Sequence, residues 1–220
     1  MMTLFKVLKA SPILIAATAL ALAGLALLSC SDDGCSPKAD EPPRDTPANL
    51  LQSFSDALEE QQIDAYAACL DEAYRFEFMP DDWDSAGVTP DTPYWGKAQD
   101  VASTANMFES VRVTSVSFDL GVPLTQMVCS DTLCLVLYYP DIQVVETYQH
   151  GTITYWVNNS RLYVTLARDP QEPDLWVIRN LQEEPGHLSA GRRDPRGLAG
   201  ATVESTTFGE VKAMFKEPLN

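Results

Sequence analysis

The sequence is short of histidine and of basic residues, and it has no apolar run long enough to span a membrane. Only two histidines occur among its 220 residues. His150 falls in a predicted turn between two strands, and His187 follows the last of the predicted strands. Neither is therefore placed to act as a base in a pocket, and a Ser–His–Asp arrangement lacks a suitable histidine.

Motifs that hold metals or phosphates are also missing. The chain contains no phosphate-binding loop and no nucleophile motif. No second cysteine pair or nearby histidine completes a set of four zinc ligands around Cys129 and Cys134. The sequence thus predicts no metal and no cofactor.

Acidic residues outnumber basic residues by 31 to 15, which gives a formal net charge of −16. Loss of the first 29 residues would remove Lys6 and Lys9 and no acid, changing −16 to −18. A nucleic acid would repel such a chain, so nucleic acid is not an expected partner. The simplest explanation of the negative net charge is that it keeps the chain soluble.

The N-terminus has the layout of a secretory signal peptide. Two lysines precede the run from Ile13 to Leu28, in which Thr18 is the single polar residue. This run is shorter than the ~20 residues of a membrane-spanning helix. A basic start, an apolar middle and a small residue at the end are typical of a cleaved segment.

The end of this run, Leu27-Leu28-Ser29-Cys30, resembles the lipobox of bacterial lipoproteins. The resemblance implies a signal peptide over residues 1–29 and acyl chains such as palmitate on Cys30. Several acyl chains hold a protein on a membrane stably. Ser31 resembles an outer-membrane sorting signal, so the expected location is the cell envelope, on the periplasmic or surface face. Residues 31–47 are polar and rich in proline, and they read as a disordered tether.

Four cysteines remain once Cys30 is assigned to lipid. Cys129 and Cys134 flank a turn-like SDTL stretch, which favours a disulfide across a hairpin. Cys69 lies on the apolar side of a predicted helix and is expected in the core.

The elements predicted along the chain are helices first and strands later. Apolar spacings of three and four residues indicate helix from Ala48 to about Ala73, as one bent helix or two short ones. Tyr74 to Phe78 reads as a short strand, Met79 to Pro93 as a loop, and Tyr94 to Ser110 as a further helix. Period-two runs then predict strands at residues 111–120, 133–139, 142–149, 152–157, 161–167 and 175–181. The Asn158-Asn159 pair predicts the tight turn of the clearest hairpin.

Helices followed by hairpin-connected strands predict an α+β domain with a curved, mainly antiparallel sheet. The opening NLLQSFSDALEEQQIDAYAACL, the pairs Trp95-Gly96 and Met107-Phe108, and the strand LWVIRNLQEE resemble the nuclear transport factor 2-like (NTF2-like, SnoaL-like) cone fold. The resemblance covers about residues 48–185, and a cystatin-like or other α+β roll is the rival. In residues 186–220 the sequence predicts a surface loop and a short amphipathic helix, with capping-box spacing from Thr207 to Glu210.

Candidate pocket residues lie on the predicted strands. Asp119 and Glu146 are acids within strands, and either would suit base chemistry if kept dry, although both would more commonly face solvent. Aromatic residues that would line a pocket, or simply pack under the helices, are Tyr138, Tyr148, Tyr155, Trp156 and Trp176.

Three hypotheses for function follow. The leading one is a membrane-tethered, noncatalytic domain that binds a small molecule or an envelope protein. The second, implied by the cone fold, is a lyase or isomerase with Asp119 or Glu146 as base. The third is a structural envelope component that forms a homodimer through its sheet. Fold alone cannot choose among them.

Overall fold

The computed structural model describes residues 44–125, 127–130, 132–157, 160–186 and 201–216. The predicted signal peptide, Cys30 and most of the predicted tether fall outside these ranges. The compact unit spans Glu41–Asn220. Within the described ranges, no helix has the length and apolar character needed to cross a membrane.

The unit begins with two short helices, α2 (Pro47–Glu59) and α3 (Ile63–Ala68). Thr46 caps α2 by accepting a hydrogen bond from the Asn49 amide, 3.1 Å away. The break between the helices falls at Gln61, whose φ of 56° is left-handed. The predicted helix ends earlier than expected, because Leu70 already belongs to strand β1 (Leu70–Glu77), which pairs with a distant strand.

The remaining elements are helices and one short strand, then a run of strands, and a final helix. In chain order they are η1 (Pro80–Asp82), α4 (Trp83–Ala86), β2 (Tyr94–Gly96), α5 (Lys97–Glu109), β3 (Val113–Asp119), β4 (Val128–Cys129), β5 (Leu133–Tyr138), β6 (Asp141–Tyr148), β7 (Gly151–Val157), β8 (Ser160–Arg168), β9 (Trp176–Pro185), β10 (Ala201–Thr206) and α6 (Phe208–Met214).

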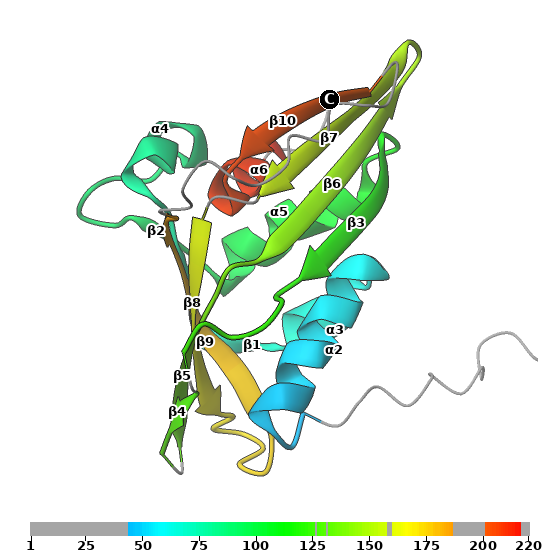
Figure 1. Ribbon diagram of the computed structural model, residues 1–220. Coiled ribbons are helices and arrows are strands. Elements are labelled where there is room, and N and C mark those ends of the chain that lie inside the picture. The colour runs from blue at the N-terminus through cyan, green and yellow to red at the C-terminus, as the bar shows by residue number, and fades with distance from the viewer. Residues whose placement is uncertain (1–43, 126, 131, 158–159, 187–200, 217–220) are drawn as a thin grey trace, which may run out of the picture. The chain divides into compact units, whose positions relative to one another are not determined.

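The strands form two sheets. One sheet has the order β2-β1-β9-β8-β5-β4 and the other the order β10-β7-β6-β3. Only Tyr139 and Pro140 separate β5 from β6, so this segment runs out of one sheet and directly into the other (Figure 1). The expected α+β class is confirmed. Most pairings are antiparallel, and β1–β9 and β10–β7 are parallel.

Several local predictions were wrong. The hairpin expected at Asn158-Asn159 does not form, because β7 pairs with β6 and β10 while β8 pairs with β5 and β9. The Asn pair itself lies outside the described residues. Residues 79–93 contain η1 and α4 instead of loop alone, and the helix expected from Tyr94 begins three residues later because β2 pairs with β1. Strands β4 and β10 were not predicted.

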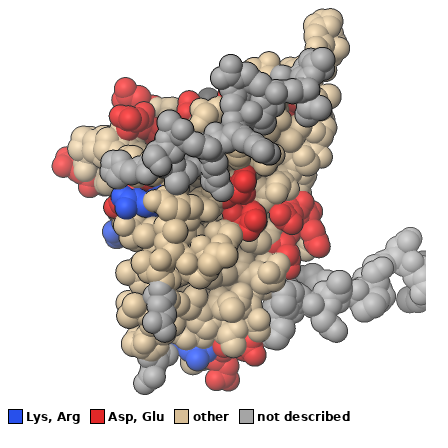
Figure 2. Space-filling model, viewed as in Figure 1, with Lys and Arg blue, Asp and Glu red and all other residues tan. Residues whose placement is uncertain are grey.

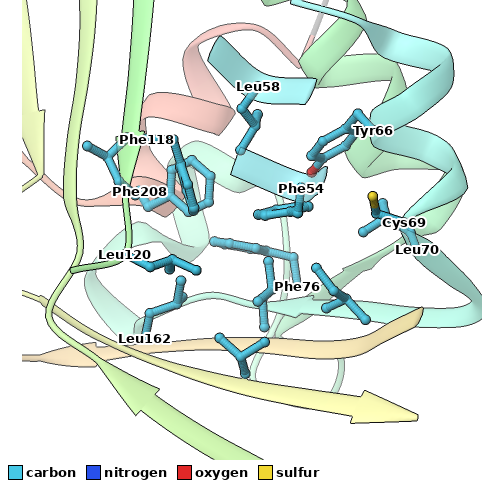
Figure 3. Packing of buried hydrophobic residues seen from close by; sticks show 14 of the residues in the cluster. Phe54, Leu58, Tyr66, Cys69, Leu70, Phe76, Phe118, Leu120, Leu162 and Phe208 are labelled. Carbon is cyan, nitrogen blue, oxygen red and sulfur yellow. The ribbon is translucent and has the colours of Figure 1, made fainter. Parts of the chain in front are cut away.

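Aromatic side chains from distant parts of the chain meet in the core (Figure 3). Phe54 of α2 has its ring centroid 5.3 Å from those of Tyr66 and Phe118. Phe208 of α6 lies 5.5 Å from Phe76 and 5.6 Å from Phe118. Each such buried ring stabilises the fold by roughly 1.5–3 kcal/mol. The C-terminal helix is thus a part of the core.

A buried ion pair anchors this helix. Lys212 of α6 is 2% exposed, and its Nζ lies 2.8 Å from Oδ1 of Asp100 in α5. The same Nζ donates to the Tyr66 hydroxyl at 2.9 Å and to the Thr104 hydroxyl at 3.2 Å, and Tyr66 donates to Asp100. Burial lowers the pKa of Lys212, while Asp100 acts to raise it. The predicted apolar face of the helix included Met214, which is exposed instead.

A second buried carboxylate holds the start of α6. Glu183 of β9 accepts hydrogen bonds from the backbone amides of Phe208 and Gly209, each at 2.8 Å. Asp82 accepts from the Thr207 hydroxyl at 2.9 Å. Burial raises the pKa of Glu183 to about 7, against the lowering effect of its two amide bonds.

Replacing the buried lysine tests the ion pair. Lys212→Met leaves Asp100 charged and uncompensated in the core, so the free energy of unfolding should fall by about 3–5 kcal/mol in urea denaturation. Adding Asp100→Asn should recover most of that loss. Equal stabilities of the single and double variants would contradict the pairing.

Glu183 makes stability depend on pH. Because its folded-state pKa of about 7 exceeds the ordinary 4.5, its contribution is fully present below pH 4.5 and is lost as the pH rises to about 7. Urea denaturation at pH 5 and at pH 8 should show that the free energy of unfolding falls by on the order of 2–3 kcal/mol between the two pH values. Glu183→Gln should reduce this difference, leaving a smaller fall of the same sign from Asp82, whose pKa burial also raises.

Candidate functional site

A groove lies between helix α2 and the segment that follows β3. Its volume is about 330 Å³. Leu51, Leu120 and Met127 contribute apolar wall, and Asp119 and Tyr138 contribute polar groups. Two candidates taken from separate strands of the sequence therefore line one hollow.

Local chain geometry places the two polar groups. Asp119 is the last residue of β3, and its carboxylate accepts a hydrogen bond from the Gly121 amide at 2.7 Å. Gly121 has a φ of 66°, which lets the chain turn away from the strand. Tyr138 ends β5 on the side of the sheet that faces the core. Asp119 is exposed, so it lies at the rim and not inside the cone.

Tyr138 is a largely buried residue whose hydroxyl is still accessible to solvent. Its residue is 5% exposed, yet the hydroxyl makes no hydrogen bond with any described residue. Burial raises the pKa of Tyr138, so the hydroxyl stays protonated near neutral pH. Because this hydroxyl remains accessible to solvent, an acceptor bound in the groove would replace water as its partner.

Three further candidates, Glu146, Tyr148 and Tyr155, lie together on the smaller sheet. Glu146 is 5% exposed on the inner face of β6. One of its oxygens, Oε2, accepts from the Tyr148 hydroxyl at 2.6 Å and from the Tyr155 hydroxyl at 3.2 Å. Burial, and then the charge of Glu146, raises the pKa of Tyr155 well above its usual value. The Arg112 guanidinium lies 5.5 Å from the centre of the Tyr148 ring. The other oxygen of Glu146 has no bonding partner among the described residues.

The remaining candidates lie apart from both arrangements. Trp156 is on the opposite face of β7 from Tyr155 and donates to Asp141 at 2.6 Å. Trp176 is buried at the start of β9, with the Arg168 guanidinium 4.3 Å from its ring. Both therefore have structural partners.

The two cysteines expected to pair do so in the structure. Cys129 and Cys134 form a disulfide between opposed residues of β4 and β5. Cys69 is buried, as expected. His150 lies in the exposed turn between β6 and β7, and His187 and Cys30 lie outside the described residues.

Sequence reasoning missed the groups buried beneath α6. Lys212 sits between Val211 and Ala213, and nothing in its neighbours indicates that it points inward. Glu183 follows an apolar strand and looks like an ordinary solvent-facing acid. Among the residues that the structure describes, no group of three or more His, Cys, Asp or Glu side chains is arranged to hold a metal ion.

Comparison with known proteins gives a likeness of fold. No family model matches the chain, and no curated protein matches it. Solved structures do resemble it. The Kfla4162 protein of Kribbella flavida gives a TM-score of 0.49 at 9% identity, over 65% of this chain and 90% of that one. An NTF2-like superfamily protein from Salmonella enterica gives 0.45 at 10% identity, over 68% and 92%.

ActVI-ORFA of Streptomyces coelicolor is a further similar structure, with a TM-score of 0.45 at 13% identity over 64% of this chain and 95% of that one. The likeness to these proteins concerns the arrangement of helices and strands alone. It assigns no substrate, reaction or partner to this chain.

Two tyrosines should respond differently when their hydroxyls are removed. Tyr138→Phe should change the free energy of unfolding by no more than about 0.5 kcal/mol, because that hydroxyl bonds to no described residue. Tyr155→Phe should cost about 1–2 kcal/mol, because it removes a donor from a buried carboxylate. Urea denaturation of both variants beside wild type gives the comparison. A Tyr138→Phe loss as large as that of Tyr155→Phe would show that the hydroxyl has an internal partner.

Proposed function

We propose that this chain is a lipoprotein of the cell envelope whose domain binds a small molecule, without catalysis, in the groove between α2 and β3. The observation that carries the proposal is a groove with apolar walls that Tyr138 and Asp119 both line, in which the Tyr138 hydroxyl makes no hydrogen bond with a described residue. Ligand pockets typically combine apolar walls with a few such polar groups.

The lining indicates the chemistry of the ligand. Leu51, Leu120 and Met127 favour a compact apolar body. Tyr138 offers a hydrogen bond to an acceptor on that body, and the exposed Asp119 carboxylate would attract an amine or another donor. A volume of about 330 Å³ limits the bound part to a small molecule. An amphipathic amine or amino alcohol fits these requirements.

Packing beneath the sheets supports binding over catalysis. The space where cone-fold enzymes hold their reacting groups contains Phe54, Phe118 and Phe208 in mutual contact. The Asp100 carboxylate there is paired with Lys212. These groups are committed to holding α6, so the surface groove is the better place for a ligand.

The membrane anchor rests on the sequence. The lipobox-like Leu27-Leu28-Ser29-Cys30 and the polar segment after it predict an acylated Cys30 and a tether to the described domain. An outer-membrane location follows from Ser31 in the same way.

Native mass spectrometry of the lipoprotein, extracted from membranes in mild detergent, tests both parts. The mass of the chain should correspond to residues 30–220 plus acyl chains. A small mass should co-purify and leave on denaturation. Tyr138→Phe and Asp119→Asn should each reduce its occupancy at least fivefold. Tyr163→Phe, which removes a hydroxyl from a strand residue outside the groove, is the matched control.

The outcomes separate the hypotheses. A co-purifying mass unaffected by Tyr138→Phe would exclude the groove as the site. A monomer without a bound molecule would favour the hypothesis that the partner is an envelope protein. A homodimer without a bound molecule would favour the structural role. A chain that retains residues 1–29, or that lacks acyl chains, would contradict the anchor without affecting the groove.

A second candidate function, an acid–base lyase or isomerase, is favoured by one observation. Glu146 is buried on the inner sheet face, its Oε2 held by two tyrosine hydroxyls while Oε1 has no described partner. This arrangement would suit a base that takes a proton from carbon. Asp119, the other acid considered, is exposed and does not share this setting.

Incubation of the co-purified molecule with the protein in D₂O tests this alternative. Deuterium should appear at a carbon position in the NMR spectrum if Glu146 acts as base. Glu146→Gln should abolish the exchange, while Asp119→Asn should leave its rate per bound ligand unchanged. Absence of exchange with a fully loaded wild-type protein would remove the alternative for that ligand.

A further inference from the structure

The hairpin formed by β4 and β5 carries apolar side chains into solvent, together with the loop before it. Val122 is 84% exposed, Val128 72% and Leu135 46%, and Leu124 and Leu133 are also exposed. Val128 and Leu135 are opposite each other across the hairpin, and the Leu124 amide donates to the Leu137 carbonyl beside it at 2.8 Å. We call these five residues, Val122, Leu124, Val128, Leu133 and Leu135, the hairpin surface.

This surface is also poor in charge. Between Asp119 and Asp141 the sequence has a single charged residue, Asp131, although 21% of the whole chain is charged. In Figure 2 red acidic side chains lie at the upper left, at the right and at the lower edge of the view, while the area over β4 and β5 is mainly tan. A contiguous apolar patch of this kind on an acidic protein indicates a contact surface.

The hairpin surface lies at the same end of the six-stranded sheet as the start of the described chain. The Trp176 amide donates to the Arg44 carbonyl at 2.7 Å, which places Arg44 beside the beginning of β9. Trp176 pairs with Arg168 at the end of β8. The Arg168 amide in turn donates to the Thr132 carbonyl, 3.2 Å away, just before β5. With strands ~4.8 Å apart, Arg44 lies roughly 15 Å from the hairpin.

The length of chain before Arg44 keeps this end close to the anchor. Residues 31–43 number thirteen, and a fully extended chain of that length spans at most ~45 Å. The chain therefore leaves the domain beside the hairpin surface and reaches Cys30 within that distance.

We infer that the hairpin surface rests on the lipid bilayer to which Cys30 is anchored. This inference depends on the lipid anchor of the proposed function. Anchoring confines the domain near the bilayer, so a weak apolar contact suffices to orient it. Exposed valine and leucine side chains suit the boundary between headgroups and acyl chains. Asp169, Glu172 and Asp174 at the same end would oppose an anionic surface, so zwitterionic lipid is the favoured partner.

The contact would also bring the groove to the membrane. Pro123 and Met127 of the groove lie between residues of the hairpin surface along the chain. A ligand of amphipathic character would then pass between bilayer and groove without crossing open water.

Hydrogen–deuterium exchange of the full lipidated protein in phosphatidylcholine vesicles tests the inference. The reference is the same protein released from vesicles at a protease site inserted between residues 31 and 43. Amides in residues 122–135 should exchange at least fivefold more slowly on vesicles, and those of α5 at the same rate in both states. Val128→Asp combined with Leu135→Asp should remove the protection.

Val111→Asp is the matched control, because Val111 is 96% exposed at the other end of β3 from Asp119 and should leave the protection intact. Protein that floats with vesicles but shows no protection would overturn the docking and leave the anchor standing. Protein that does not float at all would refute the anchor and the docking together. Protection that vanishes on dilution of the protein within the vesicles would assign the surface to a second copy of the chain, and would overturn the inference as well.

Discussion

The ion pair between Lys212 and Asp100 is the interaction on which the rest of the domain depends. It joins the last helix of the chain to α5 in a space that excludes water, with Tyr66 and Thr104 supplying the remaining hydrogen bonds. A buried charge is tolerated only when it is paired and hydrogen-bonded. Because Lys212 has no other acidic partner among the described residues, α6 has one position in which its charge is satisfied. That position brings Phe208 against Phe76 and Phe118 and completes the aromatic core.

Side chains of α6 fill part of the interior, and this affects where a ligand can bind. The interior contains the buried rings of Phe54, Phe118 and Phe208 and the Lys212–Asp100 ion pair. The Tyr138 hydroxyl beside α2 and one oxygen of Glu146 on the smaller sheet make no hydrogen bond with a described residue. The first adjoins a groove, which is why binding there is the preferred proposal over acid–base chemistry at Glu146.

The start of the described chain and the apolar β4–β5 hairpin lie at one end of the domain. Both are found where β8 ends and β5 and β9 begin (Figure 1). The Cys129–Cys134 disulfide ties β4 to β5 at this end and limits the freedom of the exposed hairpin. The described chain thus begins beside the end of the sheet that carries the β4–β5 hairpin. Tyr138 of the groove lies at the other end of β5, opposite Leu162.

The sequence by itself determined what depends on neighbouring residues. Period-two alternation identified most strands, the Thr207 cap identified the start of α6, and the spacing of Cys129 and Cys134 indicated their bridge. It could not determine which strands pair. Asn158-Asn159 has the composition of a hairpin turn, yet β7 and β8 lie in different sheets, because pairing is decided by partners far away in the chain. For the same reason only the tertiary structure placed Lys212 inside, Met214 outside, and Asp119 and Tyr138 in one groove: burial is a property of the whole packed core, which no local pattern of residues specifies.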